Sequence, residues 1–255
     1  LDAALQLLLA RAILAGTRVA GLMTFAPFFS SPGVPTRIKI GFTILLTALL
    51  YPVYARFPVP TTLAAWMPSE ASEIVIGILM GWTIQFVFEG MELAGQIIGF
   101  QFGFSLVNVI DPQSQVEITV MATLQELVAL LIFLQLGVHH WLLRSVAKSF
   151  DDLPPGSGVA SMAAVEALMR FGGAMWVIGV QVALPVLFAT MLADIAMGFL
   201  GKATPQFPVL FLGISVKTML GLGILSAIVA YWPRILERHF NHAMSALQEV
   251  LRLAH

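Results

Sequence analysis

The sequence predicts an all-α integral membrane protein, and three observations lead to this class. Of its 255 residues, 58% are hydrophobic and only 11% are charged, whereas soluble domains carry about 25% charged residues. The mean hydropathy is +0.90. Apolar residues recur at helical spacing over stretches much longer than a strand. Cysteine is absent, which excludes disulfides and thiolate sites, and the net charge of −1 argues against nucleic-acid binding.

Six hydrophobic helical regions are expected, followed by an amphipathic tail from residue 233. The regions lie at about 4–29, 38–55, 72–110, 116–143, 159–200 and 206–232. Several apolar runs carry charged residues inside them: Arg11, Arg18, Glu89, Glu92, Glu117, Glu126, Asp194 and Lys217. Because an isolated charge in hydrocarbon is costly, these helices are predicted to contact protein, including partner subunits, more than lipid.

The connection between the first two regions is predicted to be a tight, structured loop. Residues 27–35 contain several prolines, which end helices. Arg37 and Lys39 follow directly and give this loop a basic edge. Together with Lys217, these two residues are the predicted contacts with other subunits.

The third region, which Ser69 is predicted to cap, carries small and polar residues on one side of the helix, at steps of three or four. They are Glu73, Gly77, Gly81, Gln85, Glu89, Glu92, Gln96, Gly99 and Gly103. Two interpretations stay open, and both can hold. Small residues four apart let two helix backbones approach closely, whereas Glu89 and Glu92 indicate a polar partner or an aqueous path.

Residues 99–112 are the most informative stretch, because an apolar helix with three phenylalanines is broken at Asp111-Pro112. Proline disfavours helical geometry at the residue before it, so the helix is expected to end here. The phenylalanines are then predicted to fill a narrow pore. The alternative is that their rings pack the chain's own core. The predicted plug residues are Phe100, Phe102, Gly103, Phe104, Ser105, Asp111 and Pro112.

The C-terminal half begins with the longest polar loop, residues 148–158, which is expected to be the most exposed connection. Residues 171–232 form a predicted helical hairpin, in which Pro185 predicts a kink. In the tail, charged residues lie opposite an apolar face. The apolar face holds Leu236, Phe240, Ala243, Leu247 and Val250. This tail is expected to be an interfacial or partner-docking helix.

Basic residues favour a cytoplasmic position for both termini, provided that all six regions cross the membrane once. No GxxxxGK[ST] loop, HExxH helix or GxSxG elbow occurs, so the sequence offers no mechanism for nucleotide hydrolysis, zinc proteolysis or acyl transfer. His139 and His140 are neighbours, which point about 100° apart on a helix and do not share a metal ion. They are interpreted as an interfacial pair at a helix end.

A family resemblance covers nearly the whole chain and depends on several motifs together. They are Arg18 with Pro27 and Val34-Pro35-x-Arg37-x-Lys39, Gly95-x-x-x-Gly99 running into Gly103-Phe104-Ser105 and Asp111-Pro112, Leu153-Pro154-x-Gly156, and Gly198 with Pro205-Gln206, Gly213 and Lys217. On these residues the chain resembles the FliR family of flagellar type III export-gate proteins, whose virulence counterparts are the SctT-type proteins. The form of the Gly103 to Pro112 motif is more similar to the flagellar proteins.

The resemblance implies a non-enzymatic subunit of a protein export channel, with no cofactor. Its partners would be FliP-family and FliQ-family subunits in a hetero-oligomeric gate, together with FlhB-family and FlhA-family export proteins. The substrates would be unfolded flagellar proteins. The location would be the bacterial inner membrane, in the flagellar basal body.

The resemblance also implies an internal division of one membrane domain, residues 1–255. Residues 1–158 would be similar to FliP-type subunits, with a plug loop at about 100–117. Residues 159–232 would form a hairpin similar to FliQ-type subunits, with Lys217 facing a carboxylate or backbone carbonyls, and residues 233–255 would be the tail.

Two other functions remain open. One is the equivalent subunit of a virulence type III secretion system. The other, less favoured, is a multi-pass small-molecule transporter, which would show paired broken helices in two related halves. No internal repeat of that kind is evident in the sequence.

Overall fold

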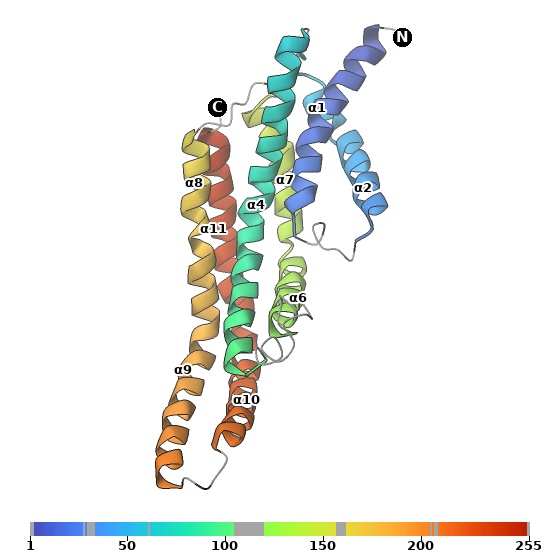
Figure 1. Cartoon of the computed structure of the whole chain (residues 1–255). Coiled ribbons are helices and arrows are strands. Elements are labelled where there is room, and N and C mark those ends of the chain that lie inside the picture. Colours follow the sequence, from blue (N-terminus) through green and yellow to red (C-terminus); the bar gives the residue numbers. More distant parts are fainter. Residues whose placement is uncertain are drawn as a thin grey trace. The chain divides into compact units, whose positions relative to one another are not determined.

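A computed structural model describes residues 3–27, 29, 34–60, 62–104, 120–156, 162–204, 206 and 209–253. Every regular element in these ranges is a helix, which confirms the all-α prediction (Figure 1). The chain divides into two compact units. Unit 1 comprises Leu1–Phe86, Phe133–Gly173 and Phe240–His255, and unit 2 comprises Val87–Ile132 and Ala174–His239. The units therefore interleave along the sequence, and the likeness of 1–158 and 159–232 to smaller subunits stays a prediction.

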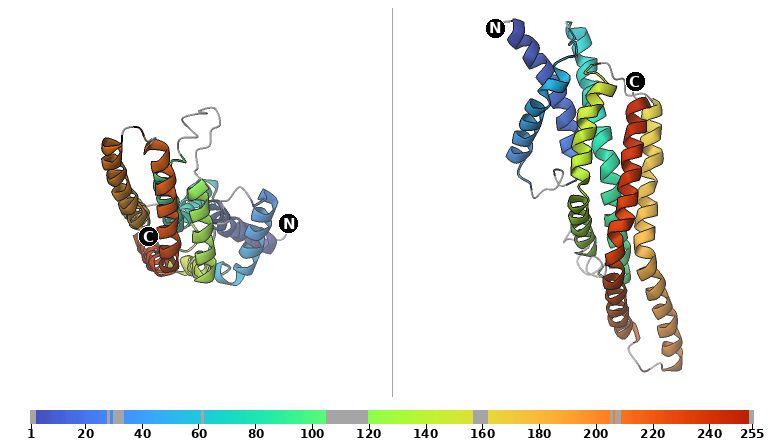
Figure 2. Two further views of the ribbon diagram at one scale, coloured as in Figure 1. Left: turned by 90° about the horizontal axis from the view of Figure 1, so that it is seen from below. Right: turned by 180° about the vertical axis from the view of Figure 1, so that it is seen from behind.

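The helices of the two units can be followed in Figures 1 and 2. Unit 1 holds α1 (Ala3–Phe25), α2 (Thr36–Leu49), α3 (Tyr51–Tyr54), the first part of α4 (Leu63–Gln101), α7 (Val138–Asp152), α8 (Met162–Gly172) and most of α11 (Trp232–Leu253). Unit 2 holds the rest of α4, most of α6 (Val120–Gln135), α9 (Ala174–Ala203), α10 (Val209–Ile228), the short 3₁₀ helix η1 (Val229–Tyr231) and the start of α11.

Four helices of the described part are long and apolar enough to cross a membrane, or up to five if α6 and α7 together make one broken span. The chain is therefore an integral membrane protein. Helix α2 has 14 residues, whereas a span needs roughly 20. The condition that all six regions cross the membrane is not met, so the cytoplasmic position of the termini stays a prediction.

Helices α1 and α4 pack at backbone distance in unit 1, as the small residues of α4 predict. A Cβ atom on Gly81 would lie 3.0 Å from the carbonyl oxygen of Leu22, and one on Gly21 would lie 2.9 Å from that of Ile74. A Cβ atom on Gly77 would collide with the carbonyl oxygen of Arg18. The packing interpretation of these glycines is confirmed.

Replacing Gly77 by alanine is expected to destabilise unit 1 by about 1–3 kcal/mol, because the backbone of α1 has to move to make room for the methyl group. The measurement is the unfolding midpoint of the purified full chain in detergent. Gly41→Ala is the matched control, since nothing lies within 4 Å of its new methyl group. That change removes a helical glycine and should be neutral or stabilise by up to about 1 kcal/mol. Equal midpoints for the two variants would contradict the close packing.

Several predicted helix boundaries are wrong. Helix α4 begins at Leu63, and Pro68 lies inside it. Ser69 is therefore not a cap, and its hydroxyl donates to the Ala65 carbonyl oxygen at 2.8 Å. The region 116–143 is broken at Gly137, whose φ of 68° lies in the left-handed region that ends helices. The region 159–200 is likewise interrupted, at Gly173 between α8 and α9.

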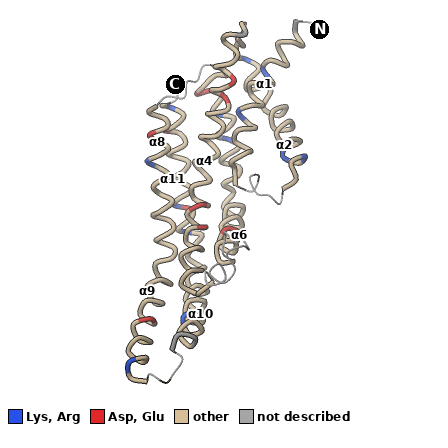
Figure 3. Tube along the Cα trace, viewed as in Figure 1, with Lys and Arg blue, Asp and Glu red and all other residues tan. Residues whose placement is uncertain are grey.

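The predicted C-terminal hairpin is confirmed in unit 2, where α9 and α10 lie side by side (Figures 1 and 2). Charged positions are sparse along both helices (Figure 3). Pro185 lies within α9, which stays continuous on both sides of it. Many apolar side chains of this hairpin are exposed, among them Trp176, Val180, Leu184, Phe188, Ile195, Val216 and Met219.

The tail forms α11, and its predicted apolar face is correct. The five side chains of that face are at most 1% exposed: Leu236, Phe240, Ala243, Leu247 and Val250. The ring of Phe240 packs against Phe133, with centroids 5.7 Å apart. The apolar face is thus covered by the chain itself. The expectation of an interfacial or partner-docking helix is therefore wrong for this face.

Candidate functional site

The C-terminal end of α4 carries the first predicted plug residues. The helix ends at Gln101, before the predicted end near residue 110. The amide of Gly103 donates to the Phe100 carbonyl at 3.1 Å, and the amide of Phe104 donates to the Gly99 carbonyl at 3.0 Å. With φ of 80° at Gly103, this is a Schellman motif, which closes the helix early. The other predicted plug residues lie outside the described residues: Ser105, Asp111 and Pro112.

The three phenylalanines at this end differ in exposure. Phe100 is 69% exposed and Phe104 37%, whereas Phe102 is only 2% exposed. Phe102 packs on α10, where a Cβ atom on Gly221 would collide with its ring. The hydroxyl of Thr218, which donates to the Ile214 carbonyl at 2.8 Å, also lies 3.3 Å from the carbonyl oxygen of Phe102. The ring of Phe102 therefore packs in the chain's own core, which was the alternative prediction. Its assignment as a pore-filling side chain is corrected.

The polar stripe of α4 combines packing with partly buried polar groups. Gly99 is buried, and a Cβ atom on Gly95 would lie 2.7 Å from the backbone nitrogen of Ala122 on α6. The Gln96 amide donates to the Glu92 carboxylate at 3.0 Å. The half-buried residues of the stripe are Gln85, Glu89 and Glu92. A polar partner or aqueous path for Glu89 and Glu92 stays a prediction.

Unit 1 contains a buried ion pair between Arg18 on α1 and Glu73 on α4. Both side chains are 0% exposed. The guanidinium donates from Nε to one carboxylate oxygen and from Nη2 to the other, the second bond being 3.0 Å long. Two parallel bonds of this kind are the strongest arrangement for arginine and a carboxylate. The charge that interrupts the first apolar run is thus fully paired inside the protein.

Groups at the end of α7 complete this cluster. The guanidinium donates to the carbonyl and hydroxyl oxygens of Ser149 at 2.9 and 3.1 Å, and to the carbonyl oxygen of Leu153 at 2.9 Å. The amide of Gly156 donates to the carboxylate at 2.9 Å. The ring of Phe150 lies 4.4 Å from the guanidinium carbon, within cation–π range. Four segments of unit 1 therefore meet at one buried charge pair.

The same contacts correct the prediction for residues 148–158. The first five of these residues belong to α7, and Leu153 is 0% exposed. Most of the polar residues of this stretch lie within α7, and the described residues that follow, 153–156, turn backbone groups toward the buried charges. It is a structural connection and not simply an exposed loop.

A second ion pair lies in the α9–α10 hairpin of unit 2. Lys217 Nζ is 3.0 and 3.2 Å from the two carboxylate oxygens of Asp194. The lysine side chain is 17% exposed and the aspartate 51%. A hollow of about 310 Å³ beside the pair is lined in part by Gly198, Gly201 and Gly213. Lys217 thus faces a carboxylate, as expected, and its contact with another subunit stays a prediction.

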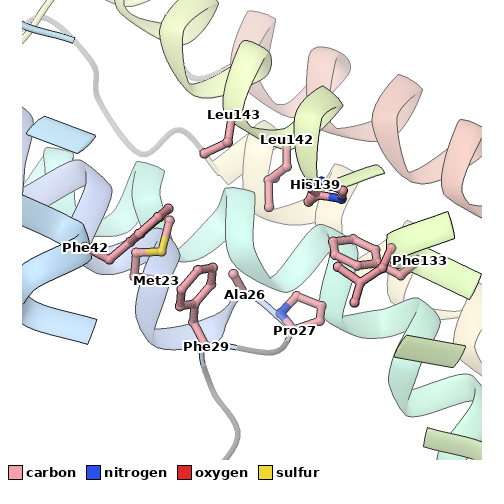
Figure 4. A pocket seen from close by; sticks show the side chains of 10 residues that line it. Met23, Ala26, Pro27, Phe29, Phe42, Phe133, His139, Leu142 and Leu143 are labelled. Atoms are coloured by element: carbon pink, nitrogen blue, oxygen red, sulfur yellow. The ribbon is translucent and has the colours of Figure 1, made fainter. Parts of the chain in front are cut away.

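An apolar cavity of about 160 Å³ lies within unit 1 (Figure 4). Its lining consists of Met23, Ala26, Pro27, Phe29, Phe42, Phe133, Leu134, His139, Leu142 and Leu143. His139 is the only polar side chain in this lining, and its Nδ1 has no hydrogen-bond partner among the described residues. The described residues also hold no group of three side chains able to bind a metal. Such walls can hold an apolar group, and His139 is the single titratable side chain among the described residues that line them.

Comparison with known proteins gives a consistent family match. The model of the family described as bacterial export proteins, family 1, matches residues 9–243. The flagellar biosynthetic protein FliR of Escherichia coli (strain K12) is 30% identical over 236 residues, covering 92% of this chain and 90% of that protein. The protein of the same name from Bacillus subtilis (strain 168) is 26% identical over 241 residues, covering 92% of each chain.

Proposed function

Because this chain belongs to family 1 of the bacterial export proteins, we propose that it is a structural and gating subunit of the flagellar type III protein export channel. In this role it passes unfolded flagellar proteins across the bacterial inner membrane, at the flagellar basal body, and it is not an enzyme. The observation that carries the proposal is the match over nearly the whole chain to relatives named for flagellar biosynthesis. The same names favour the flagellar role over its virulence counterpart.

The proposed gate begins where α4 ends. Phe102 packs against Gly221 in unit 2, and this contact fixes the chain between Phe100 and Phe104. Phe104 lies edge-on to Phe102, with ring centroids 6.1 Å apart. Phe100 and Phe104, with the following residues to about 117, would close the pore. A dry aromatic plug stops ions because each ion would have to lose its hydration shell.

The proposed partners are FliP-family and FliQ-family subunits, with FlhB-family and FlhA-family proteins beside them. Support comes from the exposed apolar side chains of the α9–α10 hairpin, such as Phe188 at 64% and Met219 at 78% exposure. A face with this many exposed apolar side chains marks contact with protein or lipid. Lys217 and Asp194 add a charged, glycine-lined hollow to the same hairpin.

The gating role is tested by deleting several residues between Phe104 and Asp111 in a chain co-expressed with its FliP-family and FliQ-family partners. The three proteins should still purify together, while the cells become permeable to ions or small molecules. Permeability is measured by uptake of a small dye and by loss of membrane potential. A milder change at a proposed plug position, Phe100→Leu, keeps the segment length and an apolar side chain and should leak less than the deletion. Complexes that assemble with unchanged permeability would show that these residues do not close the pore.

A further inference from the structure

A long apolar groove runs between α1 and α2 of unit 1 and ends at α3. Its volume is about 720 Å³. On the α1 side it is lined by residues of one helix face, which recur every three or four positions: Leu8, Leu9, Ala12, Ile13, Gly16, Thr17 and Ala20. On the other side it is lined by Thr43, Ile44, Thr47, Ala48, Tyr51 and Tyr54. The two helices touch near Gly16, where a Cβ atom would lie 3.5 Å from the Thr47 hydroxyl.

The hydroxyl groups of the three threonines and of Tyr54 in this wall are already hydrogen-bonded. Each threonine donates to the carbonyl oxygen one turn earlier in its own helix: Thr17 to Ile13 at 2.7 Å, Thr43 to Lys39 at 2.8 Å and Thr47 to Thr43 at 2.7 Å. Tyr54 donates to the Thr47 carbonyl at 3.0 Å. Burial, and then the neighbouring Tyr51, raises the pKa of the Tyr54 phenol, so it stays neutral. The groove therefore favours an occupant without polar groups along its length.

The length of the groove fits one leaflet of a bilayer. From Leu8 to Ala20 the α1 wall rises about 18 Å at 1.5 Å per residue. The hydrocarbon core of a bilayer is about 30 Å thick, so one acyl chain occupies about 15 Å of it.

The α2 wall continues to a basic end. Arg37, Ile40 and Ile44 follow one another at steps of three and four residues. Arg37 and Ile40 therefore lie on the same face of α2 as Ile44, which lines the groove. Arg37 is exposed and Lys39 half-buried, and no carboxylate of the described chain lies within 4.0 Å of either. The first turn of α2 contains no acidic residue and its N-terminus has no side-chain cap. Two cations and the positive end of the helix together favour an anion here.

We propose that this groove binds one acyl chain of an anionic phospholipid, whose phosphate is held by Arg37 and Lys39. The apolar wall selects the chain, and the two cations, which have no carboxylate of the described residues within 4.0 Å, select the charge of the head group. Each basic residue near an anionic lipid contributes about a fivefold preference over a zwitterionic lipid. For Arg37 and Lys39, this proposal replaces the expectation that they contact another protein subunit. It does not depend on the export role.

Native mass spectrometry of the purified full chain tests the proposal, with phosphatidylglycerol and phosphatidylcholine of identical acyl chains as probes. The wild type should bind phosphatidylglycerol more tightly, and Arg37→Ala with Lys39→Ala should weaken that binding about 25-fold, without changing phosphatidylcholine binding. Ala48→Trp fills the exposed groove and should weaken binding of both lipids. The matched control, Arg234→Ala with Arg238→Ala, removes two exposed cations of α11 and should change neither.

Three outcomes would overturn the proposal. One is equal binding of the two lipids by the wild type. Another is unchanged binding in the Ala48→Trp variant, because the lipid would then lie elsewhere. The third concerns the complex with its partners: a photo-reactive residue placed at Ile44 should cross-link to lipid, and cross-linking to a protein subunit instead would assign the groove to that subunit. Circular dichroism of each variant shows whether it is folded.

Discussion

Replacing Arg18 by alanine is expected to cost about 3–5 kcal/mol of stability, because it leaves the buried Glu73 carboxylate without its partner. That is a large part of the 5–15 kcal/mol that typically stabilises a folded domain. The guanidinium also donates to the carbonyl oxygens of Ser149 and Leu153, so both would lose a buried hydrogen bond, although the Ser149 oxygen keeps the bond from the Leu153 amide. The measurement is the fraction of folded full chain across a denaturant series in detergent, supported by the yield from membranes.

The chain provides a matched control for this arginine. Arg170 and Glu249 form an ion pair at 3.6 Å, with side chains 71% and 61% exposed. An exposed pair contributes about 0–1 kcal/mol, so Arg170→Ala should scarcely move the unfolding curve. An effect of Arg18→Ala as small as that of Arg170→Ala would show that the buried cluster does not hold unit 1 together.

Further substitutions distinguish charge from hydrogen bonding in the cluster. Arg18→Lys keeps the charge but lacks the planar fork that reaches the carboxylate and two carbonyls at once, so its stability should be intermediate. The double variant Arg18→Leu with Glu73→Leu removes both charges. It should recover part of the stability that Arg18→Ala loses. The recovery should stay incomplete, because the Gly156 amide would lose its carboxylate acceptor.

Much of the fold could be predicted from the sequence, because local patterns determine it. Helical class, the close approach at Gly77 and Gly81, and the buried face of α11 all follow from spacing along one helix. The sequence also indicated that Arg18 interrupts an apolar run and that Glu73 lies on the polar side of the third region. It could not show that they pair, because they are 55 positions apart and meet only when α1 packs on α4.

Two of the boundary errors have a common physical cause. The glycines at which helices end, Gly103 and Gly137, look like any other small residue until their left-handed backbone is known. Residues 148–158 were also misassigned, because their polarity predicted exposure. Their backbone groups instead complete the coordination of a buried charge pair, and only tertiary structure brings that pair to them. The core position of Phe102 depends on Gly221, which lies far away in the sequence.

Reversing the charge of Lys217 is also expected to destabilise the chain strongly. Lys217→Glu would place two carboxylates against each other in an apolar hairpin, where a single charge at the centre of a membrane helix costs about 2.5–3.5 kcal/mol. The half-exposed Asp194 reduces this cost, so a loss of about 2 kcal/mol is expected. The readouts are the amount of full chain recovered from membranes and motility of cells that depend on it.

The double variant Asp194→Lys with Lys217→Glu decides which partner Lys217 has. If the pair within the hairpin is what matters, exchanging the two charges keeps a bond at about the same place, and stability should return close to that of the wild type. Lys202→Glu, at the exposed end of α9, controls for charge reversal in the hairpin and should cost less than about 1 kcal/mol, since only the helix dipole is affected. Recovery of stability without recovery of motility would mean that the exposed face of Asp194 also contacts a partner. A double variant as unstable as Lys217→Glu alone would show that Lys217 depends on a carboxylate outside this chain.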